Sequence, residues 1–177
     1  MNFTEKKIKS ELKYQGSIVD IYHDQVQLPN GKIAGRDVVR HCEAVVVLPV
    51  LPDGQLVFVE QYRYPLAEVL LELPAGKMDV EGESAAECAR RELQEETGYQ
   101  AGELEYLGRM ATTPGFCDEI IHVFKADKLS LSTACPDEDE FVSVRKLSLE
   151  QLRTAVKNGA LYDAKTITAL FYAGYHL

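Results

Sequence analysis

Three glutamates on one predicted helix are the residues of this chain best suited to chemistry. Glu92, Glu95 and Glu96 lie within the run RELQEETGY. Because an α-helix turns by about 100° per residue, Glu95 and Glu96 fall about 60° and about 40° to either side of Glu92. Like charges at these spacings cost about 0.2–0.5 kcal/mol per pair, and a hard divalent cation would turn that cost into binding. The pattern is typical of a magnesium site.

A glutamate-rich helix face is also common in proteins that bind no metal. Arg90 and Arg91 could neutralise the helix, and Glu87 with Arg91 makes a favourable i,i+4 pair. For so short a pattern, a solvated helix face is the more frequent explanation. The residues on either side of the three glutamates decide between the two interpretations.

The flanking residues predict where this helix begins and ends. Ser84 is a typical N-cap, Glu87 completes a capping box, and Gly98 is a typical stop, so the helix should span residues 85–97. A glycine-containing loop that starts at Gly76 precedes it.

Taken together, this segment resembles the Nudix box, Gly-x5-Glu-x7-Arg-Glu-U-x-Glu-Glu-x-Gly-U, where U is apolar or aromatic. Every specified position from Glu83 to Tyr99 fits. The one departure is that six residues, rather than five, separate Gly76 from Glu83. The extra residue lies in the turn of residues 79–82, where an insertion is easily tolerated.

The resemblance implies a role for each residue of the box. Glu92 and Glu96 would be the main Mg²⁺ ligands, with Mn²⁺ as a substitute, and the backbone carbonyl of Ala75 would complete the site. Glu95 would be a further or water-mediated ligand, and Arg91 would orient the glutamates. Members of this family hydrolyse a nucleoside diphosphate linked to another group.

Outside the box, the chain resembles the ADP-ribose pyrophosphatase branch of the family. The run VEQYR ends at Arg63, and the run LELPAG contains Glu72. Thr113-Pro114-Gly115-Phe116 follows the box, with Pro114 16 residues after Gly98, the spacing associated with ADP-ribose hydrolysis. By this resemblance Arg63, Glu72, Pro114 and Phe116 would contact the substrate. Arg40 either binds substrate or only flanks a strand.

The catalytic base in this branch comes from a later acidic loop. Residues 137–140, DEDE, match it; a solvated acidic loop is the alternative explanation for such a run. We expect Glu138 to be the base, with Glu140 as a reserve base or an extra metal ligand.

Periodicity and turn residues predict the other elements. Alternating apolar residues, a turn at Pro29-Asn30-Gly31 and an extended stretch over residues 32–42 predict a small antiparallel sheet. Strands are expected at residues 44–50 and 55–61, paired through Pro52-Asp53-Gly54, and at residues 70–73, 103–110, 119–126 and 140–144. Helices are expected at residues 149–158 and 164–175.

These elements define an α/β fold with two parts. Strands broken by a few helices, without regular βαβ alternation, favour a mixed sheet between helices. With the resemblance, this predicts a Nudix-type α/β/α sandwich over residues 43–177. Residues 1–42 would form a small N-terminal antiparallel β region. A two-stranded unit is marginal alone, and the resemblance to the ADP-ribose pyrophosphatase branch implies that this region mediates a homodimer.

Composition limits the partners and the location. The net charge of -9 argues against a nucleic-acid partner, which would need a basic footprint. The four cysteines have no CxxC spacing, and the chain has neither an apolar signal segment nor a membrane-length apolar run. A cytoplasmic location is the default expectation.

The expected function is Mg²⁺-dependent hydrolysis of the diphosphate of ADP-ribose, to AMP and ribose 5-phosphate, or of related nucleoside diphosphate sugars. Hydrolysis of GDP-mannose or another nucleotide sugar is the alternative enzyme reading. A regulatory Nudix module that binds nucleotide sugars without turnover would be expected to lose box glutamates, whereas this chain keeps Glu92, Glu95 and Glu96. A third interpretation, an acidic interaction protein without a catalytic site, would mean that the match to the Nudix box arose by chance.

Overall fold

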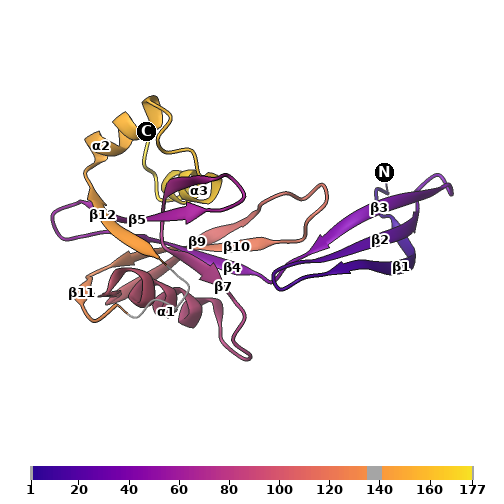
Figure 1. Ribbon diagram of the computed structural model, residues 1–177, viewed down its shortest axis with the longest axis horizontal. Helices are drawn as coiled ribbons and strands as arrows, with labels where there is room; N and C mark the ends of the chain where they lie inside the picture. The colour runs from indigo at the N-terminus through magenta and orange to yellow at the C-terminus, as the bar shows by residue number, and fades with distance from the viewer. Residues whose placement is uncertain (1, 135–140, 177) are drawn as a thin grey trace. The chain divides into compact units, whose positions relative to one another are not determined.

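The computed structural model describes residues 2–134 and 141–176 of the chain (Figure 1). The chain divides into two compact units. The first contains Met1–Cys42 and Ala111–Ile120, and the second contains Glu43–Met110 and Ile121–Leu177. Among the described residues, no helix is long and apolar enough to cross a membrane.

The first unit is built on a three-stranded antiparallel sheet in the order β1-β2-β3. Its strands are β1 (Lys6–Gln15), β2 (Asp20–Gln27) and β3 (Ile33–Arg40). The turn between β2 and β3 contains Gly31, whose φ of 82° favours glycine, and the Asn30 side chain accepts a hydrogen bond from the Lys32 N–H. The predicted N-terminal antiparallel sheet is therefore confirmed.

Strand β1 was not predicted, and its register explains why. All ten of its residues are exposed, so no face of it is selected for apolar residues. Its pairing with β2 shifts between Lys7 and Lys9 and again between Leu12 and Tyr14. Such bulges interrupt the period of two on which strand prediction depends.

Residues 111–120, which the sequence analysis placed in the second domain, group with the first unit. The backbone N–H of Val39 donates to the Phe116 carbonyl at 2.7 Å, and the Asp118 N–H donates to the Val39 carbonyl at 3.2 Å. The segment thus continues the hydrogen bonding of β3. This contact joins residues far apart in the chain, so no local pattern could show it.

The second unit contains a mixed four-stranded sheet, a three-stranded sheet and a short two-stranded pair. The four-stranded sheet has the order β7 (Ala75–Lys77), β4 (Ala44–Pro49), β10 (Ile120–Asp127) and β9 (Glu103–Ala111), with β4 parallel to β10 and antiparallel to β7. The three-stranded sheet has the order β12 (Val142–Leu147), β5 (Leu56–Arg63) and β6 (Glu68–Glu72), and the short pair joins β11 (Ser130–Leu131) to β8 (Tyr99–Gln100). The prediction of a mixed sheet is confirmed.

The predicted pairing of residues 44–50 with residues 55–61 is wrong. Only one bridge, Val50 to Leu56, joins the two segments beside their turn. Strand β4 instead has β7 and β10 as neighbours, and β5 has β6 and β12. Both strands lie inside a sheet, so each uses its two edges for other partners, and the turn between them connects two sheets rather than closing a hairpin.

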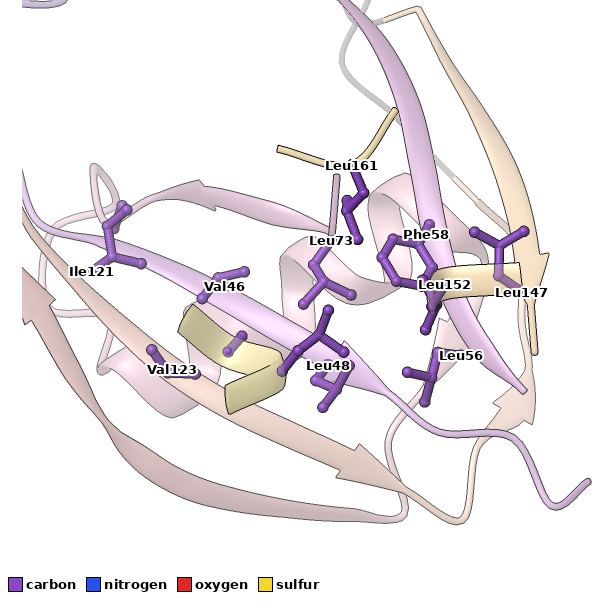
Figure 2. Close-up of a cluster of buried hydrophobic side chains, with 13 residues drawn as sticks. Val46, Leu48, Leu56, Phe58, Leu73, Ile121, Val123, Leu147, Leu152 and Leu161 are labelled. Carbon is purple, nitrogen blue, oxygen red and sulfur yellow. The ribbon is translucent and has the colours of Figure 1, made fainter. Parts of the chain in front are cut away.

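Strand β4 separates two hydrophobic clusters. Val45 and Val47 pack in one cluster with Cys88, Ala89 and Leu93 of α1 (Ala85–Thr97). Val46 and Leu48 point into the other cluster (Figure 2). That cluster includes side chains from β5, α2 (Leu149–Lys157) and α3 (Ala164–Tyr172), among them Phe58, Leu152, Ala169 and Leu170. Helix α1 thus covers one side of β4 and the other helices cover the opposite side, as predicted for an α/β/α sandwich (Figure 1).

Helix α1 begins and ends where its capping residues predict. The Ser84 side chain accepts from the Glu87 N–H, and the Glu87 carboxylate accepts in return from the Ser84 N–H at 2.9 Å. Gly98 ends the helix with a φ of 71°. Fixed ends give every side chain on the helix a fixed direction, which the glutamates require.

Candidate active site

Helix α1 buries two of its three candidate glutamates. Glu92 is 8% exposed and Glu96 is 3% exposed, while Glu95 is half-buried. Carboxylates removed from water need compensating partners, since an isolated buried charge is costly. The groups around these two side chains are therefore part of the candidate site.

The loop before the helix lies directly against both buried carboxylates. The Ala75 N–H donates to Oε2 of Glu96 at 3.1 Å. A β-carbon at position 76 would lie 2.0 Å from Cδ of Glu92, far closer than non-bonded carbons approach one another. Gly76 is thus needed for space, not for an unusual backbone angle. The Pro74 carbonyl accepts from the Val47 N–H at 2.9 Å, which anchors this loop to β4.

The extra residue between Gly76 and Glu83 is accommodated in a turn. The Glu83 N–H donates to the Val80 carbonyl at 3.2 Å, and Gly82 has a φ of 81°. Glu83 then accepts from Nε and Nη2 of Arg91, both at 2.9 Å. The insertion therefore leaves the contact between Glu83 and the helix intact.

Arg91 binds three glutamates at once. Besides Glu83, its Nη1 donates to Glu92 at 2.7 Å and to Glu95 at 2.9 Å. The hydrogen bond with Glu83 raises the pKa of Arg91 above its ordinary value and holds the pKa of the Glu83 carboxyl below its own. Arg91 therefore restricts the orientation of these acidic side chains, and its role at a metal site stays a prediction.

The residues at this site are suited to a metal ion that takes some of its ligands from the protein and others from the substrate. In the described part of the chain, no three His, Cys, Asp or Glu side chains form a ready-made metal site. Magnesium is usually held by one or two protein carboxylates together with waters and substrate phosphates, rather than by an all-protein cage. Glu92 and Glu96, beside the backbone of Ala75, provide such a partial ligand set.

Arg63 forms an ion pair near these carboxylates. Its Nε and Nη2 donate to the two oxygens of Glu72 at 2.6 and 2.7 Å. This hydrogen bonding raises the pKa of Arg63 despite its burial, and the charge of Glu96 adds to the effect. Arg63 is therefore within electrostatic reach of a candidate metal ligand. A cation there is suited to the negative charge of a diphosphate.

Glu72 itself is almost fully buried, with 1% of its side chain exposed. Burial would raise the pKa of its carboxyl, but Arg63 and Lys165 together hold it below the ordinary value. Both of its oxygens contact these two cations. The expected contact of Glu72 with the substrate stays a prediction.

Three further candidates belong to the first unit. Arg40 donates through Nη1 to Asp118 at 2.7 Å, and Asp118 also accepts from the His41 N–H at 3.0 Å. Pro114 and Phe116 lie in a turn closed by the bond from the Phe116 N–H to the Thr113 carbonyl. Pro114 and Phe116 are exposed. Their substrate contacts stay predictions.

Glu138 and Glu140, the expected base and its reserve, lie outside the described residues. Their roles also stay predictions.

The sequence predicted a helix from residue 164, but it did not predict that the first turn of this helix, α3, contacts the candidate site. Asp163 caps this helix, Lys165 binds Glu72, and the hydroxyl oxygen of Thr166 accepts from the Leu73 N–H at 2.8 Å. The only local signal was the capping pattern of Asp163, which marks a helix start. Nothing near Lys165 in the sequence indicates an acidic partner 93 residues away.

Family models match almost the whole chain. The NUDIX domain model matches residues 40–170, and the model of the nucleoside diphosphate sugar hydrolase N-terminal domain matches residues 5–39. With the glutamates, the glycine loop and the α/β/α layers arranged as above, the chain belongs to the Nudix family.

Similar proteins cover both parts of the chain. It is 44% identical to an ADP-ribose pyrophosphatase of Bacillus subtilis (strain 168), over 95% of this chain and 91% of that protein. It is also 44% identical to a methanol dehydrogenase activator of Bacillus methanolicus, over 96% and 92%. A crystal structure of an ADP compounds hydrolase superposes with a TM-score of 0.87 over 98% of this chain and 94% of that chain, at 22% identity, which confirms the fold.

The fit of Gly76 against Glu92 generates a prediction for Gly76→Ala. The far end of the Glu92 side chain is flexible, so the new methyl group should displace the carboxylate rather than unfold the loop. We expect the protein to remain folded, with Mg²⁺ affinity and diphosphatase activity each reduced by about tenfold or more, as for loss of a metal-orienting contact. Metal titration and steady-state kinetics measure these effects.

The matched control is Gly54→Ala, in the turn between β4 and β5. Gly54 has a φ of 81° and no atom within 4 Å of an added β-carbon. Alanine there should cost about 1 kcal/mol of stability through backbone strain, with activity retained. If Gly76→Ala kept wild-type metal affinity, the close fit would have no role in the site.

Proposed function

We propose that this Nudix hydrolase cleaves the diphosphate of ADP-ribose in a Mg²⁺-dependent reaction, giving AMP and ribose 5-phosphate. The observation that carries the proposal is the pair of buried glutamates, Glu92 and Glu96, held against the Ala75–Gly76 backbone with Arg63 within electrostatic reach. Such a site combines carboxylates for a hard cation with a cation for phosphate oxygens. The relative from Bacillus subtilis named for ADP-ribose supports the choice of substrate.

Each group has a distinct role in this proposal. A divalent cation, when bound, would neutralise the diphosphate and lower the pKa of a water. Glu92, Glu96 and the Ala75 carbonyl would hold the metal, and Glu95 would contribute directly or through a water. Arg91 keeps the acidic side chains in place, and Arg63 binds a phosphate oxygen. The water oxygen bonds to one phosphorus as the bridging P–O bond breaks.

The proton of the attacking water passes to a carboxylate outside the box. The acidic segment at residues 137–140 provides it, with Glu138 as the base and Glu140 as the reserve or an additional ligand. Arg40, Pro114 and Phe116 bind the remainder of the nucleotide sugar. These assignments rest on the family resemblance of the motifs.

A second candidate substrate is GDP-mannose. The chain is 34% identical to a GDP-mannose pyrophosphatase of Yersinia enterocolitica over 75% of this chain and 73% of that protein. The 44% identity to the B. subtilis ADP-ribose pyrophosphatase, over more of both chains, favours ADP-ribose. A binding module without turnover is disfavoured because all the box glutamates are present, and Arg91 orients Glu92 and Glu95 among them.

Cys88 and Cys117 carry free thiols. Free thiols are the rule in a reducing compartment, which supports the cytoplasm as the location we propose.

We also propose that the first unit mediates a homodimer. Every residue of β1 is exposed, and its apolar side chains Ile8 and Leu12 are 53% and 45% exposed. An edge strand with exposed apolar residues favours pairing with another surface. Light scattering at micromolar concentration should give twice the chain mass of 19.8 kDa. A mass equal to one chain would refute the dimer.

Product analysis tests the proposed reaction directly. With Mg²⁺ or Mn²⁺, ADP-ribose should give AMP and ribose 5-phosphate in equal amounts, and EDTA should abolish turnover because the carboxylates alone cannot activate water. Chromatography of the products with AMP and ADP standards distinguishes the outcomes. Release of ADP or inorganic phosphate, or full turnover in EDTA, would exclude this chemistry. A panel that includes GDP-mannose ranks the two substrates by kcat/KM.

The assignment of the base predicts the behaviour of Glu138→Gln. Glutamine keeps the size of the side chain but cannot accept the proton, so kcat should fall by about 10²-fold or more while KM and metal affinity change little. Glu140→Gln is the matched variant and should reduce kcat less, unless Glu140 binds a metal. Wild-type turnover by Glu138→Gln would assign the base to another carboxylate.

A further inference from the structure

The Glu72 cluster consists of Arg63, Glu72, Asp163 and Lys165, all in the second unit. Lys165 Nζ contacts Oε2 of Glu72 and lies 3.2 Å from Oδ2 of Asp163. Arg63 binds the same Oε2 and also Oε1. Two cations and two carboxylates therefore alternate from Arg63 to Asp163, and their formal charges cancel.

The cluster is mostly hidden from solvent. The side chains of Lys165 and Asp163 are each 15% exposed, compared with 1% for Glu72 and 38% for Arg63. Burial weakens screening by water, so these contacts are stronger than those of surface ion pairs. Of the four side chains, Arg63 has the largest exposed fraction, so it is the member best able to meet a ligand.

The geometry of Arg63 depends on Glu72. The pair uses Nε and Nη2, which leaves the Nη1 donors outside this ion pair. A planar guanidinium bound through two donors has a fixed plane, so the direction of Nη1 is set by the position of the Glu72 carboxylate. A residue that fixes the position of the Glu72 carboxylate therefore also fixes the orientation of the Arg63 guanidinium.

The first turn of α3 holds the Glu72 segment at two points. Lys165 binds the Glu72 side chain, and Thr166 accepts from the backbone N–H of Leu73, the next residue. Asp163 caps the helix by accepting from the Thr166 N–H at 3.1 Å. The same segment continues to Ala75, so this helix end supports both Arg63 and the loop at the candidate metal site.

We propose that Lys165 is a positioning residue for binding of the substrate diphosphate. It fixes Glu72, and through Glu72 it fixes Arg63, while its charge offsets that of a carboxylate that would otherwise repel the phosphates. This proposal rests on the proposed function in one respect, namely that the ligand of Arg63 is a diphosphate. Lys165 touches no reacting atom and acts only through its neighbours.

The main test compares Lys165→Gln with Lys165→Arg. Glutamine removes the charge, so the KM for ADP-ribose should rise about tenfold with kcat within about twofold, the pattern of lost uniform binding. Arginine restores the charge and should bring KM back to within about threefold of wild type. Lys157→Gln, at the exposed end of α2, removes the same charge elsewhere and should leave KM unchanged.

Binding without turnover separates this proposal from the proposed function. ADP-ribose is titrated into wild type and Lys165→Gln in EDTA, and the variant should bind about tenfold more weakly. If wild type binds ADP-ribose in EDTA but does not hydrolyse it when Mg²⁺ is supplied, the proposed function fails, and the weaker binding by Lys165→Gln still supports the role of Lys165. Wild-type affinity and KM in Lys165→Gln would overturn it, as would equal losses in the glutamine and arginine variants.

Asp163→Asn keeps the test decisive if Lys165→Gln does not fold. Asparagine caps a helix about as well as aspartate, so α3 should remain intact. Lys165 would then have one carboxylate partner instead of two, and the affinity for ADP-ribose should equal or exceed that of wild type. A tenfold loss of affinity in Asp163→Asn would assign the effect to the helix end and overturn the proposal.

Discussion

The burial of two carboxylates in one turn of α1 is the constraint on which the rest of the site depends. Glu92 and Glu96 lie at 8% and 3% exposure, where a charge is stable only beside suitable partners. The Ala75 N–H, the absence of a side chain at Gly76 and the guanidinium of Arg91 meet that need. Strand β4 holds the loop, and the helix caps hold the glutamates, so the fold serves to keep these groups together.

Charge is balanced locally in this acidic protein. Arg91 is surrounded by glutamates from the box, and Arg63 is bound by Glu72. If Arg63 binds the substrate as proposed, its direction is already fixed by Glu72, so little orientational entropy would be lost on binding. The net charge of -9 is therefore compatible with binding of a phosphate group, because the electrostatic potential at the site depends mainly on the charged side chains nearest to it.

Local structure, such as the ends of a helix, was predictable from the sequence, whereas contacts between residues far apart in the chain were not. The ends of α1 followed from Ser84, Glu87 and Gly98 because caps involve residues within one turn. The pairing of β4 with β10, instead of β5, depends on contacts across much of the chain. Strand β1 was missed because its bulges break the alternation, and Lys165 because its partner Glu72 is 93 residues away.

The box alone does not select a substrate. Its glutamates and Arg91 would handle a diphosphate, and every nucleoside diphosphate sugar contains one. Selection must therefore come from groups outside the box that meet the nucleoside and the sugar. Two relatives, each 44% identical to this chain, have names that describe different activities, so overall sequence similarity does not by itself identify the substrate. Of the candidates, Arg63 is tied by contacts to Glu72 and the first turn of α3, while Arg40 and Phe116 are tied to β3. These side chains are held by residues outside α1, so substrate selection would depend on contacts that the box itself does not contain.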